Sequence, residues 1–321
     1  MPYESILVAS VAPMEMHRAN SGQNELGNAT AIKRRPDGRV YISGQMQRHA
    51  LFEALSRLNE RDDEAPEGTY VSNGDGTTFL VEKDLRADLG GFMIIDIEGE
   101  PGRRTAPVSA TPAVASEQSN TVRDLLLRLS TQDDDQNIAT MELSQEDRMR
   151  SAFHLDCTAL STSKRYTYEA TSEDERGLHV GTERVRHVDP GERERRARLF
   201  LRATRFPSAY ASQARNATTG EPQKVFIVLD TRLSRKGGRY FAMDDTEQQR
   251  LKDELDERGA DYFEGDDTDT DADSVESAYS DALGALAEKG IVDRAEAQMS
   301  YAETFEALSD LEDFPREVEA A

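Results

Sequence analysis

The stretch GNATAIKRRPDGRVYISGQMQRHAL, residues 27–51, places a basic turn directly before the start of a helix. An Asp-Gly pair lies between two short extended runs, residues 31–35 and 39–42, and this pattern predicts a β-hairpin. Ser43 is a good N-cap, because its hydroxyl can accept a hydrogen bond from a first-turn amide. We therefore expect a hairpin that leads into a helix running from Ser43 to about Asn59.

The predicted helix has two different sides. Its apolar side follows a 3.6-residue period and should face the core. On the other side, Gln45 and Arg48 lie one turn apart, with Phe52 near them. We expect these two donors and the aromatic ring to be free to meet a ligand or a neighbouring subunit. The apolar side consists of Met46, Ala50, Leu51, Ala54, Leu55 and Leu58.

The basic turn opposes the charge of the rest of the chain. The 321 residues include 62 Asp+Glu and 39 Lys+Arg, a formal net charge of -23, whereas Lys33, Arg34, Arg35 and Arg39 cluster around the turn. A solvated charged turn is one interpretation. Phosphate binding is the other, because the free amides and the positive end of the helix dipole already favour an anion there. Charge alone leaves both open.

Arginine supplies 32 of the 39 basic side chains, and acidic residues are spread along the whole chain. This composition suggests adaptation to a salty cytoplasm, in which net charge keeps a protein dissolved, so it is poor evidence against an anionic partner. No segment approaches the roughly 18 apolar residues of a membrane helix, and the N-terminus lacks the pattern of a signal peptide. We expect a cytoplasmic protein with no membrane partner.

Further elements are predicted from apolar periodicity and turn residues. A helix at residues 193–205 carries many arginines, and because Glu183, Glu192 and Glu194 interleave with them, we expect it to be exposed and self-paired. Strands are expected at residues 6–11, 78–82, 92–97, 138–143, 153–160 and 225–229, helices at 121–129 and 246–258, an irregular projecting segment at 101–119, and an acidic linker at 264–274 before two short helices.

Motifs for metal or nucleotide chemistry are missing from the sequence. The acidic run starts like a calcium loop at Asp267, but Ala272 and Ala278 replace its glycine and its glutamate. The five histidines form no zinc-binding pair, and no phosphate-binding loop or nucleophile elbow occurs. Cys157 is expected to be a buried core side chain, and His154 a strand residue with a satisfied ring. We expect no catalytic residue, no metal and no cofactor.

Several segments resemble the DevR branch of the CRISPR Cascade backbone family, the seventh-numbered Cas family. The resemblance begins with Gly27-Asn28, the basic pair Lys33-Arg34 and the run Tyr41-Ile-Ser-Gly-Gln-Met-Gln-Arg48. Farther along, Asp88-Leu-Gly-Gly-Phe-Met93 and Arg104-Thr-Ala-Pro-Val-Ser109 are similar to two further family elements, and residues 138–143 and 153–156 to family strands. The similarity covers roughly residues 1–240.

The resemblance implies an α+β fold with a ferredoxin-like palm of the RNA-recognition-motif type, a finger-like insertion and a thumb hairpin, all within residues 1–240. Residues 241–321 would form C-terminal helices with an acidic linker, packed on the same domain. The thumb is expected within residues 101–120, with residues 206–222 as the alternative.

The resemblance also implies a non-catalytic backbone subunit of a type I Cascade surveillance complex, in a system of subtype I-B. Its partners would be CRISPR RNA, target DNA through that RNA, further copies of itself and other Cascade subunits. The implied RNA contacts are Asn28, Lys33, Arg34, Arg35, Ser43, Gln45 and Arg48.

Two other functions remain open from sequence. One is a metal-dependent endoribonuclease like the backbone subunits of type III complexes, which use a loop aspartate. Asp37 lies in a suitable loop, although the turn already explains its Asp-Gly pair. The other is an autoregulatory role, for which no helix-turn-helix DNA reader is evident.

Overall fold

The structure is a computed structural model that describes residues 1–20, 24–25, 29–74, 78–97, 100–128, 137–171, 174–211 and 217–304. The helices are α1 (Gly44–Asn59), α2 (Leu85–Gly90), α3 (Pro190–Ala203), α4 (Asp245–Glu257), α5 (Val275–Lys289) and α6 (Tyr301–Thr304), with a 3-10 helix η1 (Lys236–Ala242). The strands are β1 (Ser5–His17), β2 (Asn24–Glu25), β3 (Ala29–Thr30), β4 (Tyr41–Ile42), β5 (Phe92–Ile97), β6 (Glu100–Arg104), β7 (Val108–Ala110), β8 (Ala113–Ala115), β9 (Thr121–Arg128), β10 (Asn137–Asp156), β11 (Thr162–Thr171), β12 (Asp174–Arg186), β13 (Lys224–Asp230), β14 (Asp261–Asp266) and β15 (Ala297–Gln298).

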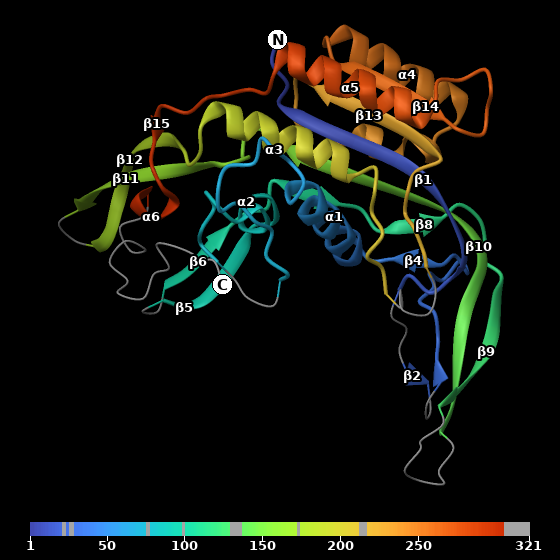
Figure 1. Cartoon of the computed structure of the whole chain (residues 1–321). Helices are drawn as coiled ribbons and strands as arrows, with labels where there is room; N and C mark the ends of the chain where they lie inside the picture. Colours follow the sequence, from blue (N-terminus) through green and yellow to red (C-terminus); the bar gives the residue numbers. More distant parts are fainter. Residues whose placement is uncertain are drawn as a thin grey trace.

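A central antiparallel sheet in the order β14-β13-β1-β10 forms the body of the protein (Figure 1). Strands β7 and β8 pair with the opposite edge of β10, and β4 pairs with β8. In sequence, the elements of this body follow as β1, α1, β7 with β8, β10, α3 and β13. Helix α1 lies in the chain between β1 and β7, which are separated in the sheet by β10, and α3 lies between β10 and β13, which are separated by β1.

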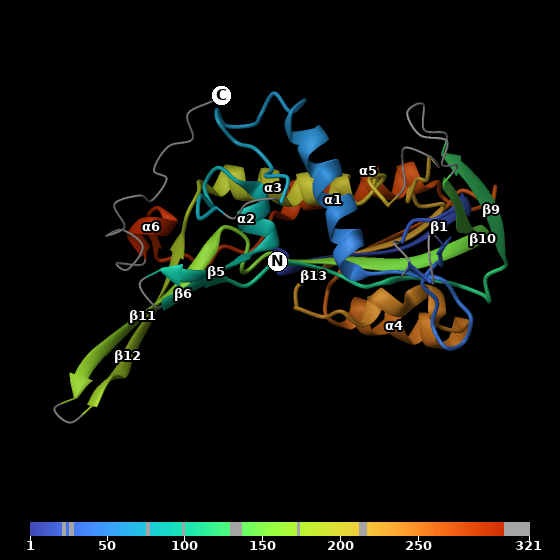
Figure 2. The same cartoon turned by 90° about the horizontal axis from the view of Figure 1, so that it is seen from below.

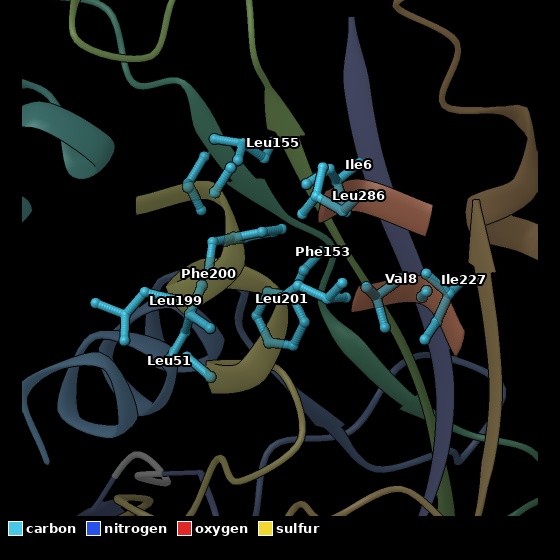
Figure 3. Packing of buried hydrophobic residues seen from close by; sticks show 14 of the residues in the cluster. Ile6, Val8, Leu51, Phe153, Leu155, Leu199, Phe200, Leu201, Ile227 and Leu286 are labelled. Atoms are coloured by element: carbon cyan, nitrogen blue, oxygen red, sulfur yellow. The ribbon is translucent and has the colours of Figure 1, made fainter. Parts of the chain in front are cut away.

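Helices cover both faces of the sheet, and this explains why nearly all of β1 is buried. Ile6 and Val8 pack with side chains of α1, α3 and α5 on one face, as Figure 3 shows. Leu7 packs on the other face with η1 and α4, where the rings of Phe226 and Tyr240 stack with their centroids 3.8 Å apart. Figure 2 shows α4 on one side of the sheet and the other three helices opposite it. A strand covered on both faces needs a continuous apolar run, which β1 has.

Two long hairpins extend away from this body. One is formed by β9 and the first half of β10, and the other by β11 and β12 (Figures 1 and 2). Among the residues that the structure describes, no helix has the length and apolar character needed to cross a membrane.

The predictions from local patterns are largely confirmed. The expected strands at 6–11, 92–97 and 225–229 are parts of β1, β5 and β13. The helix capped by Ser43 is α1, and the helix expected at 246–258 is α4, with a capping box between Asp244 and Glu247. These elements carry their own start signals or an uninterrupted apolar run, so short windows of sequence were enough to predict them.

Three predictions of elements are wrong, and the extent of a fourth is too long. Residues 78–82 form a loop and turn, and residues 121–129 contain strand β9 where a helix was expected. The segment 101–119 neither lacks regular structure nor projects as a thumb: it contains the end of β6 and all of β7 and β8, the last two of which pair with β10. The strand expected at 138–143 is confirmed as part of β10, and the strand expected at 153–160 is the end of the same β10, which stops at Asp156. For residues 101–119 and 121–129, pairing with β10 decides the conformation.

Two single-residue predictions have different outcomes. Cys157 is fully buried, as expected, and burial raises the pKa of its thiol. His154 is a strand residue, but neither ring nitrogen has a hydrogen-bond partner in the part of the chain that is described, so the prediction of a satisfied ring is wrong. Burial, followed by the charge of Arg235, lowers the pKa of His154 to about 4, which keeps the imidazole neutral.

The arginines of α3 are the largest departure from expectation. Glu192 does pair with Arg195 and Arg196 on the same helix, as predicted, but Arg193, Arg195 and Arg196 are buried and not exposed. Arg193 donates to the carbonyl oxygens of Cys157 (2.8 Å) and, through Nε, Leu160 (2.9 Å). Burying a guanidinium is tolerated when its donors meet oxygen acceptors. These three side chains therefore serve the fold and are not a surface for phosphate.

Candidate nucleic-acid interface

A large open cleft lies where the basic hairpin, the start of α1, α2 and strand β7 meet. Its volume is about 1250 Å³, and Lys33, Ser43, Gln45 and Arg48 all line it. Arg235, which precedes η1, lines it as well. Four of the seven side chains proposed from sequence thus line one cavity.

The start of α1 forms one wall of the cleft. Ser43 caps the helix by accepting a hydrogen bond from the amide of Met46 (3.2 Å). Gly44 packs so closely that an added Cβ would lie 2.8 Å from the carbonyl oxygen of Ala110, so this position requires glycine. Gln45 is exposed, and the first turn contains no acidic residue. The amides of the first turn and the helix dipole give this wall a positive potential suited to an anion.

Two guanidinium groups meet one aromatic ring in the next part of the wall. The Cζ atoms of Arg48 and Arg86 lie 5.8 and 5.0 Å from the ring centroid of Phe52. Arg48 also donates to the carbonyl oxygen of Gly90, while Arg86 pairs with Glu53 at 3.6 Å. Burial, together with the nearby charge of Arg86, lowers the pKa of Arg48. An anion in the cleft would relieve this like-charge repulsion.

Phe52 itself is not free to meet a ligand. The residue is 3% exposed and belongs to the main apolar core, so the expectation that its ring would be available is wrong. Instead, its ring holds the guanidinium groups of Arg48 and Arg86 in place, because a cation is attracted to the face of an aromatic ring.

Asp88 fixes α2, which carries Arg86, against the rest of the molecule. Its carboxylate accepts hydrogen bonds from Arg104 Nη2 (2.6 Å), Arg196 Nη1 (2.7 Å), and the Ser161 amide (2.9 Å) and hydroxyl (2.5 Å). Burial would raise the pKa of Asp88, but the two guanidiniums and the hydroxyl hold it below its ordinary value. The segments that begin at Asp88 and Arg104, both part of the family resemblance, are therefore joined by a buried ion pair.

The basic turn has the predicted hairpin geometry. The amide of Arg35 donates to the carbonyl oxygen of Arg39 (2.9 Å), and Gly38 adopts a φ of +79°, which favours glycine. Asp37 lies 3.5 Å from the guanidinium groups of both Arg35 and Arg39 and accepts a hydrogen bond from the Arg39 amide. The carboxylate of Asp37 thus stabilises the turn.

Three of the proposed contact residues do not line the cleft. Arg34 is held by Glu142 and Thr121. Although burial raises the pKa of Glu142, its hydrogen bonds with the Ile32 amide and Thr121 and its pairing with Arg34 lower it overall. Arg35 is exposed beside the turn, and Asn28 lies outside the described residues.

Arg86 and Arg235 are cleft residues that the sequence reasoning missed. A signal was present for Arg235, because TRLSRKGGR at residues 231–239 is basic in an acidic chain and contains a Gly-Gly pair. Arg86 had no comparable signal, since its neighbourhood is ordinary for a short helix. Across the described ranges, no group of three or more His, Cys, Asp or Glu side chains is arranged to hold a metal ion.

Comparison with known proteins gives a likeness of fold. No family model matches the sequence, and no curated protein matches it. A chain of a solved CRISPR RNA-guided surveillance complex matches with a TM-score of 0.52 and 14% identity, over 88% of this chain and 99% of that chain. A chain of a second CRISPR RNA-guided surveillance complex, described as pre-nicking, matches with a TM-score of 0.51 and 12% identity over the same shares. The protein thus has the mixed α+β fold of chains found in such complexes.

Proposed function

We propose that this protein is a non-catalytic backbone subunit of a type I CRISPR Cascade complex, of the DevR branch of the seventh-numbered Cas family and of subtype I-B. It would grip the sugar–phosphate backbone of CRISPR RNA in the cytoplasm, polymerise along it and bind other Cascade subunits. The bases would stay available to pair with target DNA.

The observation that carries this proposal is the cleft. A chain with a net charge of -23 gathers Lys33, Arg48, Arg86 and Arg235 around the start of one helix. Hydroxyl and amide side chains stand beside them, and this mixture of donors suits phosphate and ribose oxygens without reading base sequence. The fold likeness to chains of CRISPR RNA-guided complexes points to the same ligand.

The strand order supports a ferredoxin-like palm. Antiparallel strands in the order β13-β1-β10-β7, with α1 and α3 on one face, correspond to the βαββαβ pattern. In this proposal, residues 60–107 form the finger-like insertion. We assign the thumb to the hairpin of β11 and β12, because it extends away from the body (Figure 2), whereas β7 and β8, within residues 101–120, pair with β10 of the central sheet.

Binding of a labelled single-stranded RNA, followed by fluorescence anisotropy, tests the cleft. Arg48→Gln and Arg86→Gln should each weaken binding about tenfold, and Arg198→Gln, at a half-buried position of α3 that does not line the cleft, should leave it unchanged. Hydrogen bonds in the cleft should make the affinity fall less steeply with potassium chloride than the roughly -0.7 per phosphate expected from ion pairs alone. Equal affinities of the Arg48 and Arg198 variants would refute the cleft as the RNA site.

A further inference from the structure

A second basic surface lies beside the cleft, on one face of the extended sheet. Arg150 of β10 lies directly opposite Val114 of β8, and Val114 lies opposite Tyr41 of β4. Side chains directly opposite each other in an antiparallel ladder project to the same face. Arg150, Val114 and Tyr41 therefore form a row across three strands.

The hairpin adds three more basic side chains to this face. Arg39 precedes Tyr41 by two residues, so both share a face. Arg35 is opposite Arg39, to which it is hydrogen bonded through the backbone, and the Tyr41 amide donates to the carbonyl oxygen of Lys33 (3.4 Å). Arg148, two residues before Arg150, continues the face along β10.

The opposite face of the same strands is apolar and covered. Val40, Ile42, Ala113 and Met149 are buried, the last three in a cluster with residues of α1. Strand alternation thus separates a packed face from an accessible one. The accessible face, which we call the platform, consists of Lys33, Arg35, Arg39, Tyr41, Val114, Arg148 and Arg150, all exposed or half-buried.

The charge of the platform is only partly balanced. Asp37 lies 3.5 Å from both Arg35 and Arg39, and Arg150 donates to the carbonyl oxygen of Phe241 (3.1 Å). Burial lowers the pKa of Arg150, and the charges of Arg39 and Arg35 lower it further, so these three cations are close enough to repel one another. A phosphate among them would relieve that repulsion.

Acidic residues mark where the platform ends. Glu146 follows on the same face of β10, opposite Glu15 of β1, and both are exposed. At the other end, Lys33 lines the cleft as well as the platform. A polyanion leaving the cleft would therefore cross the platform and stop short of these carboxylates.

We propose that the platform binds single-stranded RNA, with one base stacked on Tyr41 and adjacent phosphates held by Arg35, Arg39 and Arg150. An aromatic ring surrounded by cations is the usual surface for a single strand, because every base has a flat face to stack. Stacking leaves the pairing edge of the base free, so it is compatible with pairing to DNA. This inference rests on the proposed function and extends the RNA path beyond the cleft.

The absence of tryptophan from the sequence gives a direct test. Tyr41→Trp introduces a single tryptophan into the platform, and Tyr262→Trp introduces one on β14, at the far edge of the sheet. Binding of single-stranded RNA, monitored separately by anisotropy of an end label, should quench the fluorescence of Tyr41→Trp and leave Tyr262→Trp unchanged. Binding without quenching of Tyr41→Trp would overturn the platform.

Affinity measurements complete the test. Tyr41→Ala should weaken binding roughly 5- to 100-fold, as expected for one lost stacked base, and Tyr41→Phe should retain the wild-type affinity. Arg150→Gln should make the salt dependence shallower by about 0.7. If Arg48→Gln weakens binding while Tyr41→Ala and Arg150→Gln do not, RNA binding in the cleft is supported and RNA binding on the platform is refuted. Wild-type protein that binds no RNA would refute both.

Discussion

The substitution Asp88→Ala removes a carboxylate that accepts four hydrogen bonds and balances two guanidinium groups. The side chains of Arg104 and Arg196 are 5% and 0% exposed, so water cannot replace the lost oxygens. Removing one partner of a buried ion pair costs about 3–5 kcal/mol. We expect the free energy of unfolding to fall by that amount.

Urea unfolding followed by circular dichroism measures this loss. With a dependence of roughly 3 kcal/mol per molar urea, the midpoint should fall by about 1–2 M. Glu64→Ala is the matched control, because it removes a carboxylate with a 72% exposed side chain from the surface pair with Arg198. Surface pairs contribute about 0–1 kcal/mol, so the midpoint of this control should barely change.

Acid should also destabilise the fold through Asp88, as the Asp88→Ala substitution does. Because the folded-state pKa of Asp88 is below its ordinary value, the unfolded chain takes up the proton first. The stabilising contribution is therefore complete above about pH 4 and is lost as the pH falls further. If Asp88→Ala and Glu64→Ala lowered the urea midpoint equally, the reasoning about the buried network would be refuted.

Three further predictions concern the cleft, the sheet and catalysis. Gly44→Ala should weaken RNA binding in the anisotropy assay, because the added Cβ would lie 2.8 Å from the carbonyl oxygen of Ala110. The comparison variant Gly284→Ala lies at an open position in α5 and should raise the free energy of unfolding by about 0.5–1 kcal/mol. Burial lowers the pKa of His154 to about 4, against 6.5 when unperturbed, so the unfolded chain takes up a proton first as the pH falls. The free energy of unfolding should therefore decrease between pH 7 and pH 5. In urea titrations at these two pH values, His154→Leu should make that decrease smaller by roughly 2 kcal/mol. Guide-complementary RNA incubated with magnesium should remain intact with wild-type protein and with Asp37→Ala; cuts that only the wild type makes would establish a nuclease.

The sequence alone was sufficient for elements whose determinants are local. Ser43 and the apolar side of α1 lie within a few residues of each other, and the run at the start of β1 is apolar throughout. The cleft wall at the start of α1 could also be predicted from local sequence, because Lys33, Ser43, Gln45 and Arg48 all lie close in sequence to that helix start.

Features that depend on distant partners could not be predicted in this way. A helix was expected at residues 121–129, but these residues contain strand β9, which pairs along its length with β10. Arg196 was expected on the surface because glutamates surround it, but its partner Asp88 is 108 residues away in sequence. The platform likewise depends on the register between β4, β8 and β10, which only the assembled sheet determines.

Isolation of the protein from its natural host, followed by analysis of what is bound to it, tests the central claim most directly. If the chain is a backbone subunit, it should copurify with RNA of uniform length and with other subunits in a fixed ratio, and Arg48→Gln should reduce the RNA recovered per protein. Recovery of protein free of nucleic acid, or with RNA of random length and no other subunits, would contradict the proposed function.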